Sequence, residues 1–405
     1  MTRSPENRLR ICFYVTGHGL GHATRAIEVC RQLMESGHQV CVCSSVPEGI
    51  FRRELPDLAM FRDVELDSGA VQRGPMAVDA RATLECYRDL IHHHHEDLVH
   101  QEETFIKKNA FHLVLSDATP LCVAAAWRAG VKSAVITNFS WDHIYQDLLD
   151  RLQQRRDDER RGSGRGGPPL TAEEAGEFQE MIDQIVEDYG CADTLLRLPG
   201  FHNMTAFKKV VDVPLVVRRP QKTGWEVRDA LGIPQSAHVA LLTFGGHRHI
   251  GSTQPDLRDD LLPEGWLCLV LGGTTNGAPL QALEDGRFLL VGKDVYVPDL
   301  VNAADVVIGK LGYGTAAEML CCNKPSVHVS HSNWAEEQHL VDMLNEFGVT
   351  VKIPKETFAE GNWAPYLKRA EQLHLRSEKR FHRSCEGGKI ITSIVEEMAG
   401  IKSGV

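Results

Sequence analysis

The sequence lacks a long hydrophobic run, a leader-like N-terminus and a regular spacing of cysteines. No stretch of it approaches the roughly 18 consecutive apolar residues that a membrane-spanning helix needs. The N-terminal MTRSPENRLR is polar throughout, unlike the basic and then apolar start of a secretory signal. The 11 cysteines include no C-x-x-C pair. We therefore expect a cytoplasmic protein without a transmembrane segment, whose cysteines are reduced core thiols.

An excess of positive charge is also missing. The 44 Lys and Arg residues face 55 Asp and Glu residues, which leaves a net charge of −11. Since nucleic acids need a basic footprint, we expect no nucleic-acid partner. The sequence contains neither a carboxylate pair of the D-x-D type nor a G-x-S-x-G elbow. These absences disfavour a transferase that chelates a metal and a serine hydrolase.

What is present is a regular alternation of strand-like and helix-like segments. In the first half, residues 9–16 and 38–44 have strand patterns, and residues 23–37 between them have a helical pattern. A second set follows, with strands at 111–115 and 133–137 and a helix at 120–129. Such alternation predicts an α/β fold with parallel sheets that are covered by helices on both faces.

The length of 405 residues and a repeat of the strand and Gly-rich turn pattern predict two domains. The predicted parts are an N-terminal Rossmann-like domain at 8–212, a linker at 213–222, a C-terminal Rossmann-like domain at 223–388, and a helix at 389–400 that crosses back to the first domain. The charged and then Gly/Pro-rich residues 151–170 are expected to be a disordered insertion.

The first Gly-rich turn, TGHGLGHATR at residues 16–25, carries the densest signal. Its alternate glycines let the backbone approach a ligand closely. His22 follows at the carboxyl edge of the sheet, where a neutral imidazole can act as a general base, and Asp117 is placed to orient its ring. A capping or core histidine is the alternative. Binding of a metal by His18 and His22 is disfavoured, because the glycines make a regular helix there unfavourable, and we expect no metal.

A second Gly-rich turn, GKLGYGT at residues 309–315, follows another buried strand. The backbone amides of this turn are expected to bind phosphate. Gly245 and Gly246, which follow an earlier strand, are expected to approach the same phosphate from the other side. Glu318, one turn into the next helix, can bridge ribose hydroxyls or be a solvated helix residue. The residues expected to contact a bound diphosphate are Gly245, Gly246, Gly312, Tyr313, Gly314 and Thr315. The residues expected to hold the hydroxyls of an attached sugar are Glu336, Glu337 and Gln338.

Taken together, these motifs resemble those of GT-B glycosyltransferases. Over residues 9–398 the chain is similar to the N-terminal glycosyltransferase-like region of plant L-arabinokinases, through YVTGHGLGHATR, SDATP, TNFSWDHIY, EDYGCADTLLRLPG, DVPLVVRR, TFGG and GKLGYGTAAE. More distantly it resembles the bacterial peptidoglycan N-acetylglucosaminyltransferase. Those plant proteins continue into a kinase domain, whereas this sequence ends at Val405. We therefore do not expect arabinokinase activity.

The resemblance implies a GT-B fold, in which two Rossmann-like domains with parallel sheets face each other across a cleft. It also implies roles for single residues. His22 is similar to the catalytic base, residues 312–315 to the diphosphate cradle, and Glu318 to the ribose-binding carboxylate. Gln338 resembles the donor-sugar contact, and Val297 stands where the nucleotide base is met.

The expected function is an inverting, metal-independent sugar transfer from a nucleoside diphosphate sugar, a uridine one, to an unknown hydroxyl acceptor, without a cofactor. The acceptor is expected at the first domain, near Asp67, Gln72 and residues 138–145. The residues of the expected acceptor loop are Gly17, His18, Gly19, Gly21 and Asn138. The alternatives are a nucleoside-diphosphate-sugar 2-epimerase and a non-catalytic nucleotide-sugar-binding partner of a sugar kinase.

Overall fold

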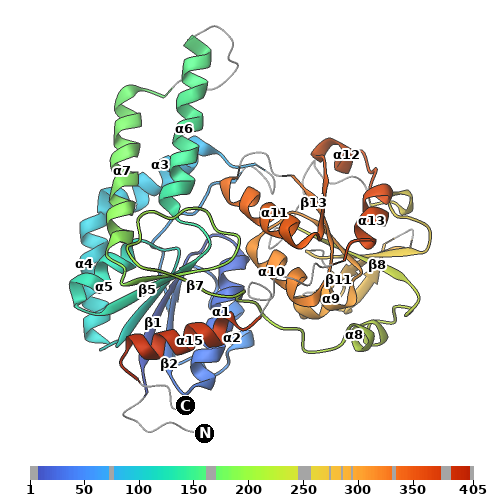
Figure 1. Cartoon of the computed structure of the whole chain (residues 1–405), viewed down its shortest axis with the longest axis horizontal. Helices are drawn as coiled ribbons and strands as arrows, with labels where there is room; N and C mark the ends of the chain where they lie inside the picture. The colour runs from blue at the N-terminus through green and yellow to red at the C-terminus, as the bar shows by residue number, and fades with distance from the viewer. Residues whose placement is uncertain are drawn as a thin grey trace. The chain divides into compact units, whose positions relative to one another are not determined.

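The computed structural model of the 405-residue chain forms two compact units (Figure 1). One unit comprises residues 1–71, 78–214 and 386–405, and the other comprises residues 72–77 and 215–385. The structure describes residues 8–72, 77–160, 170–244, 257–272, 275–283, 286–292, 295–330, 334–374 and 385–401.

The first unit is built on a seven-stranded sheet with the order β3-β2-β1-β4-β5-β6-β7, in which all neighbouring strands are parallel. Its strands are β1 (Arg10–Val15), β2 (Gln39–Ser44), β3 (Met60–Asp63), β4 (Leu113–Asp117), β5 (Lys132–Thr137), β6 (Thr194–Arg197) and β7 (Val210–Asp212). Its helices are α1 (Leu20–Glu35), α2 (Glu48–Glu54), α3 (Ala80–Leu90), α4 (His95–Lys108), α5 (Leu121–Ala129), α6 (Trp141–Arg160), α7 (Ala172–Gly190) and α15 (Gly387–Met398). The central strands are buried on both faces, as parallel sheets require.

The C-terminal helix α15 is part of this first unit and packs against α1 (Figure 1). Two contacts fix its position. The Nε2 atom of His38 lies 3.0 Å from Oε1 of Glu396, with both residues buried. The Nζ atom of Lys132 donates to the carbonyl of Met398 at 2.8 Å. The end of the chain therefore completes the first sheet domain instead of extending the second.

The region of the expected disordered insertion is helical in its first part. Helix α6 continues to Arg160, so the prediction for residues 151–160 was wrong. Good helix formers occupy this stretch, and the Nε atom of Arg151 pairs with Oδ2 of Asp147 one turn earlier at 2.8 Å. The Gly/Pro-rich residues 161–169 lie outside the described residues.

The second unit has a seven-stranded sheet with the order β10-β11-β9-β8-β12-β13-β14. Its strands are β8 (His238–Thr243), β9 (Trp266–Val270), β10 (Leu280–Ala282), β11 (Phe288–Val291), β12 (Val306–Gly309), β13 (Ser326–Val329) and β14 (Thr350–Ile353). Its helices are α8 (Gly224–Ala230), α9 (Val297–Ala303), α10 (Tyr313–Cys322), α11 (Ala335–Phe347), α12 (Lys355–Ala359) and α13 (Ala364–Glu371). The edge strand β10 is antiparallel to β11 and was not predicted.

Two cysteines of the second unit differ from the expectation of reduced thiols. Cys321, near the end of α10, forms a disulfide with Cys385, and their Cα atoms are 6.1 Å apart. The other nine cysteines are free. Within the described part of the chain, no helix has the length and apolar character that crossing a membrane requires.

Gly309 ends β12 in a backbone conformation that only glycine tolerates. Its φ is +141°, and an added Cβ atom would lie 1.8 Å from the carbonyl oxygen of Thr243. We expect Gly309→Ala to lower the free energy of unfolding by at least about 2 kcal/mol, measured by urea denaturation. Gly312→Ala is the matched control, since its Cβ would meet nothing within 4 Å. Equal stability of the two variants would contradict the prediction.

Candidate functional site

The turn between β1 and α1 places His22 inside the first turn of a helix. Gly19 is the N-cap residue with φ 80°, and α1 begins at Leu20. The helical pattern was predicted from Ala23, and the helix begins three residues earlier, so that His22 lies in its first turn. The left-handed conformation of Gly19 lets the chain turn from the strand directly into the helix. His22 is therefore held rigidly, with 8% of its surface exposed.

Asp117 lies at the end of the neighbouring strand β4, where it pairs in register with Val15 of β1. Its Oδ1 atom is 2.8 Å from Nδ1 of His22. In the tautomer that donates from Nδ1 to this carboxylate, Nε2 carries a lone pair that can accept a proton. His22 and Asp117, which the sequence predicted to meet at the carboxyl edge of the sheet, are therefore in contact there.

Arg25 is the third member of this cluster, and the sequence analysis did not assign it a role. Its Nε donates to Oδ2 of Asp117 at 2.7 Å and its Nη2 donates to Oδ1 at 2.5 Å. Its Nη1 donates to Oδ1 of Asn138 at 2.7 Å. Nη2 also lies 2.9 Å from Nδ1 of His22, because both nitrogens converge on the same oxygen. The sequence offered one signal for Arg25. It follows His22 by three residues, which places both side chains on the same face of the helix, and most residues around them are apolar.

The charge of this cluster is balanced inside the protein. Burial by itself raises the pKa of the completely buried Asp117, but the positive charge of Arg25 and the interaction with His22 outweigh it. The net effect holds the pKa of Asp117 below its usual value, so the carboxylate is ionised. A bidentate arginine of this kind fixes the carboxylate plane, which in turn fixes the imidazole ring.

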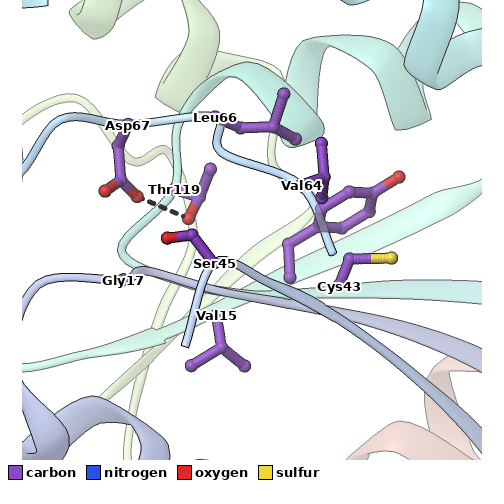
Figure 2. A pocket seen from close by; sticks show the side chains of 9 residues that line it. Val15, Gly17, Cys43, Ser45, Val64, Leu66, Asp67 and Thr119 are labelled. Atoms are coloured by element: carbon purple, nitrogen blue, oxygen red, sulfur yellow. Dashed lines mark hydrogen bonds between the residues drawn. The ribbon is translucent and has the colours of Figure 1, made fainter. Parts of the chain in front are cut away.

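A polar pocket opens at the same end of the first sheet (Figure 2). Asp67 is buried there and accepts hydrogen bonds from the hydroxyls of Thr16 at 2.7 Å and Thr119 at 2.9 Å. Burial raises the pKa of Asp67, against the effect of these hydrogen bonds. The pocket has an empty volume of about 190 Å³, part of it open to solvent, and its lining includes Gly17 but not Gln72.

The other residues of the expected acceptor loop have contacts of their own. Nδ1 of His18 accepts from the amide of Ala70 at 3.1 Å, and its ring meets Trp141 edge-on. Gly21 lies in the first turn of α1. Asn138 is buried and faces Arg25. His18 therefore supports the loop around residue 70, and Asn138 supports the cluster at His22.

In the second unit, α10 begins after Gly312 at the carboxyl end of β12. Gly312 has no side chain that could accept from the first-turn amides, which include those of Gly314 and Thr315. The ring of Tyr313 is buried, and its hydroxyl accepts from the amide of Val216 at 3.3 Å, so the ring belongs to the core and only its amide joins the turn. Gly245 and Gly246 lie outside the described residues.

Glu318 does not stand as an isolated carboxylate. Its Oε1 accepts from Nη2 of Arg218 at 3.0 Å, and both side chains are at most 10% exposed. The guanidinium of Arg218 lies 5.4 Å from the ring centre of Tyr296. Tyr296 precedes α9, whose first residue is Val297, the expected contact of the nucleotide base. Neither Arg218 nor Tyr296 was predicted, because nothing in their local sequence pattern links them to Glu318.

The loop into α10 also carries Lys310, which the sequence analysis quoted without a role. Burial lowers the pKa of Lys310, while the nearby carboxylates of Glu336 and Glu337 oppose the shift. Glu336 accepts from the indole of Trp334 at 3.0 Å. Gln338, the next residue of α11, is exposed and donates to Asp342 at 2.7 Å. The acidic residues thus lie near a cation of the candidate donor turn, whereas the amide of Gln338 is directed along its own helix.

Comparison with known proteins gives one sequence relative. No family model matches the chain. L-arabinokinase from Arabidopsis thaliana is 36% identical over 399 residues, which cover 97% of this chain and 35% of that protein. The chain thus spans about a third of the length of this relative.

Solved structures match the whole chain in fold. They include the glycosyltransferase of kitacinnamycin, with a TM-score of 0.64, 16% identity and coverage of 96% of this chain and 99% of the other. A UDP-glucosyltransferase from Polygonum tinctorium matches with a TM-score of 0.56, 12% identity and coverage of 98% and 99%. MurG of Acinetobacter baumannii matches with a TM-score of 0.50, 13% identity and coverage of 97% and 100%.

These matches confirm the fold class and the resemblance that the motifs predicted. The chain is a protein of the GT-B glycosyltransferase fold, related in sequence over nearly its whole length to plant L-arabinokinase.

Proposed function

We propose that this protein is a glycosyltransferase that moves a sugar from a nucleoside diphosphate sugar, a uridine one, to a hydroxyl acceptor. The observation that carries the proposal is the hydrogen bond of 2.8 Å between His22 and the buried Asp117. It leaves Nε2 of His22 as the group that accepts a proton. Two carboxylates or a nucleophilic serine would instead indicate hydrolysis.

In the proposed step, Nε2 of His22 removes the proton of the acceptor hydroxyl. The acceptor oxygen forms a bond to the anomeric carbon as the bond from that carbon to the diphosphate breaks. Attack opposite the leaving group inverts the anomeric configuration. The ionised Asp117 stabilises the imidazolium that forms, and Arg25 keeps the carboxylate in place.

The donor is assigned to the second unit. The first-turn amides of α10 provide partial positive charge for the diphosphate. Lys310, in the loop that leads into α10, is a further candidate cation. Glu318, oriented by Arg218, is the candidate ribose contact. Because these groups can stabilise the departing diphosphate, we propose a reaction that needs neither a divalent ion nor a cofactor. A chelator should leave the rate unchanged.

The test is calorimetric binding of uridine, guanosine and adenosine diphosphates and their common sugar conjugates. We expect saturable binding of the uridine series, weakened about 10-fold or more in Glu318→Gln, since a hydrogen bond to a charged group contributes about 1.5–3 kcal/mol. Glu371→Gln is the control, because Glu371 of α13 pairs with His238 in the same unit. Binding of none of these nucleotides would contradict the proposal.

The similarity to L-arabinokinase favours a second candidate, a nucleotide-sugar-binding partner of a sugar kinase. Such a protein would bind the donor without consuming it. Product analysis with and without candidate acceptors separates the two functions. Transfer to an acceptor supports the transferase, and binding without turnover supports the partner. Conversion of the donor in the absence of any acceptor would instead show an epimerase.

A further inference from the structure

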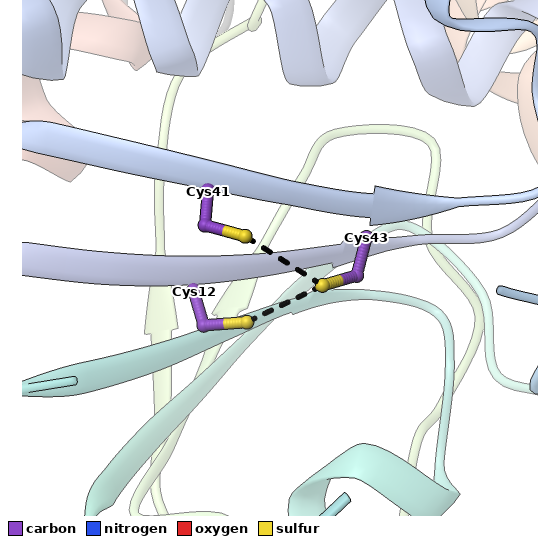
Figure 3. Close-up of side chains that lie close together, drawn as sticks. All are labelled: Cys12, Cys41 and Cys43. Carbon is purple, nitrogen blue, oxygen red and sulfur yellow. Dashed lines mark hydrogen bonds between the residues drawn. The ribbon is translucent and has the colours of Figure 1, made fainter. Parts of the chain in front are cut away.

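Three buried cysteines form a compact cluster on one face of the first sheet (Figure 3). Cys12 of β1 pairs in register with Cys41 of β2, and Cys43 lies two residues further along β2. Side chains two residues apart on a strand share a face, so all three thiols point to the same side. The Sγ atom of Cys43 lies 3.6 Å from that of Cys12 and 3.9 Å from that of Cys41.

These distances match those between thiolates bound to one ion. Zinc–sulfur bonds of about 2.3 Å place sulfurs about 3.8–4.0 Å apart in tetrahedral or trigonal geometry. The three Sγ atoms all lie within 4.8 Å of one another. Among the described residues, this is the one group of three His, Cys, Asp or Glu side chains whose ligand atoms are so close. The sheet register therefore holds the sulfurs near a ligand geometry without any change of the backbone.

Two arginines lie on the same face of the sheet as the cysteines, and one of them is already paired with a buried carboxylate. Arg62 of β3 is in register with Cys43, and Arg10 precedes Cys12 by two residues on β1. Arg62 is bound to Glu102 of α4. Arg10 adds a positive charge at the other end of the cluster. Buried charges need such compensation, and a bound cation supplies the rest.

One member of the cluster also borders the pocket at the end of the first sheet. Cys43 lines the polar pocket of Figure 2, together with Gly17 and Ser45. All three cysteines are at most 3% exposed, so an ion bound to them would be shielded from water.

We propose that Cys12, Cys41 and Cys43 bind one thiophilic metal ion, Cu(I) or Zn(II), through their three sulfurs. Soft thiolate ligands select these ions over Mg²⁺ or Ca²⁺. Binding releases the thiol protons, and the ion stabilises the pairing of β1 with β2. None of the three cysteines has a role in the proposed sugar transfer, although Cys43 lines the same pocket as Gly17. The site adds a metal-binding capacity that the proposed reaction does not use.

The test uses the full-length, reduced protein under anaerobic conditions. Cu(I) and Zn(II) are titrated separately in competition with chromophoric chelators, and thermal unfolding is followed with and without each ion. We expect one equivalent of one of the two ions to bind with nanomolar or tighter affinity and to raise the Tm. Preference for Cu(I) or Zn(II) identifies the ion. Failure of both to bind tighter than micromolar overturns the proposal.

Cys43→Ala is the decisive variant, because Cys43 lies near both other sulfurs. We expect its affinity to fall by more than the roughly 10–100-fold that loss of an outer partner of a metal site costs. Cys41→Ala is a second variant for the case that Cys43→Ala does not fold. Cys268→Ala is the control, since Cys268 is equally buried but lies in the second unit. Equal loss in the control, or retained binding in both cluster variants, would overturn the proposal.

Discussion

Replacing His22 by alanine is expected to lower the rate of sugar transfer about 100–10,000-fold, the usual contribution of a general base. Affinity for the nucleotide should remain nearly unchanged, because the proposed donor contacts belong to the second unit and His22 to the first. The rate is measured as single-turnover sugar transfer, with the nucleotide sugar that binds in the calorimetric test. His112→Gln is the control, since His112 is exposed and accepts from the amide of Arg10 at 2.9 Å.

Asp117→Asn tests the role of His22 as a base while leaving its imidazole ring in the site. An amide in place of the carboxylate can donate to Nδ1 of His22, which favours the tautomer that carries its proton on Nε2. Such a ring cannot accept the proton of the acceptor. We expect a rate near that of His22→Ala, with donor affinity again retained. A rate equal to that of the unmodified protein in either variant would rule out His22 as the base.

The second large effect is on stability. Arg25→Met is expected to lower the free energy of unfolding by about 3–5 kcal/mol, measured by urea denaturation at pH 7. The reason is that Asp117 is fully buried and would lose both hydrogen bonds from its bidentate partner. Arg128→Met is the control, because the pair of Arg128 with the mostly exposed Glu96 should contribute at most about 1 kcal/mol. Similar losses in both variants would contradict the prediction.

The same cluster predicts how stability depends on pH. In the native protein the pKa of Asp117 is lowered, so its stabilising contribution is present above the unfolded value of about 3.9 and is lost as pH falls through the folded value. Without Arg25, burial raises the pKa of Asp117, and stability then decreases as pH rises above about 3.9. The difference in stability between the native protein and Arg25→Met should therefore widen from pH 4 to pH 7. A difference independent of pH would show that charge is not its cause.

Much of the architecture could be predicted from local hydrophobic patterns in the sequence. The alternation of strand and helix signals predicted two Rossmann-like units, because parallel strands buried on both faces must be apolar throughout. The pairing of His22 with Asp117 could also be predicted from the sequence. Both follow adjacent strands of a parallel sheet, and the carboxyl ends of such strands meet at one edge.

Other local inferences failed because a tertiary or neighbouring contact outweighed a weak propensity. Helix α1 begins at Leu20 and not at the predicted Ala23, since Gly19, with its positive φ of 80°, starts the helix directly. The charged stretch after residue 150 continues α6 as a helix, although it carries no apolar periodicity. Propensities of about 1 kcal/mol or less per residue are easily overridden in this way.

By itself the sequence therefore determined the fold class and the end of the sheet at which His22 and Asp117 meet. Only the tertiary structure paired Arg25 with Asp117, 92 residues away, and Arg218 with Glu318, 100 residues away. It also brought Cys12 next to Cys43 and joined Cys321 to Cys385. Periodicity records which face of an element is buried, but a contact between distant side chains depends on strand register and packing, which no local pattern encodes.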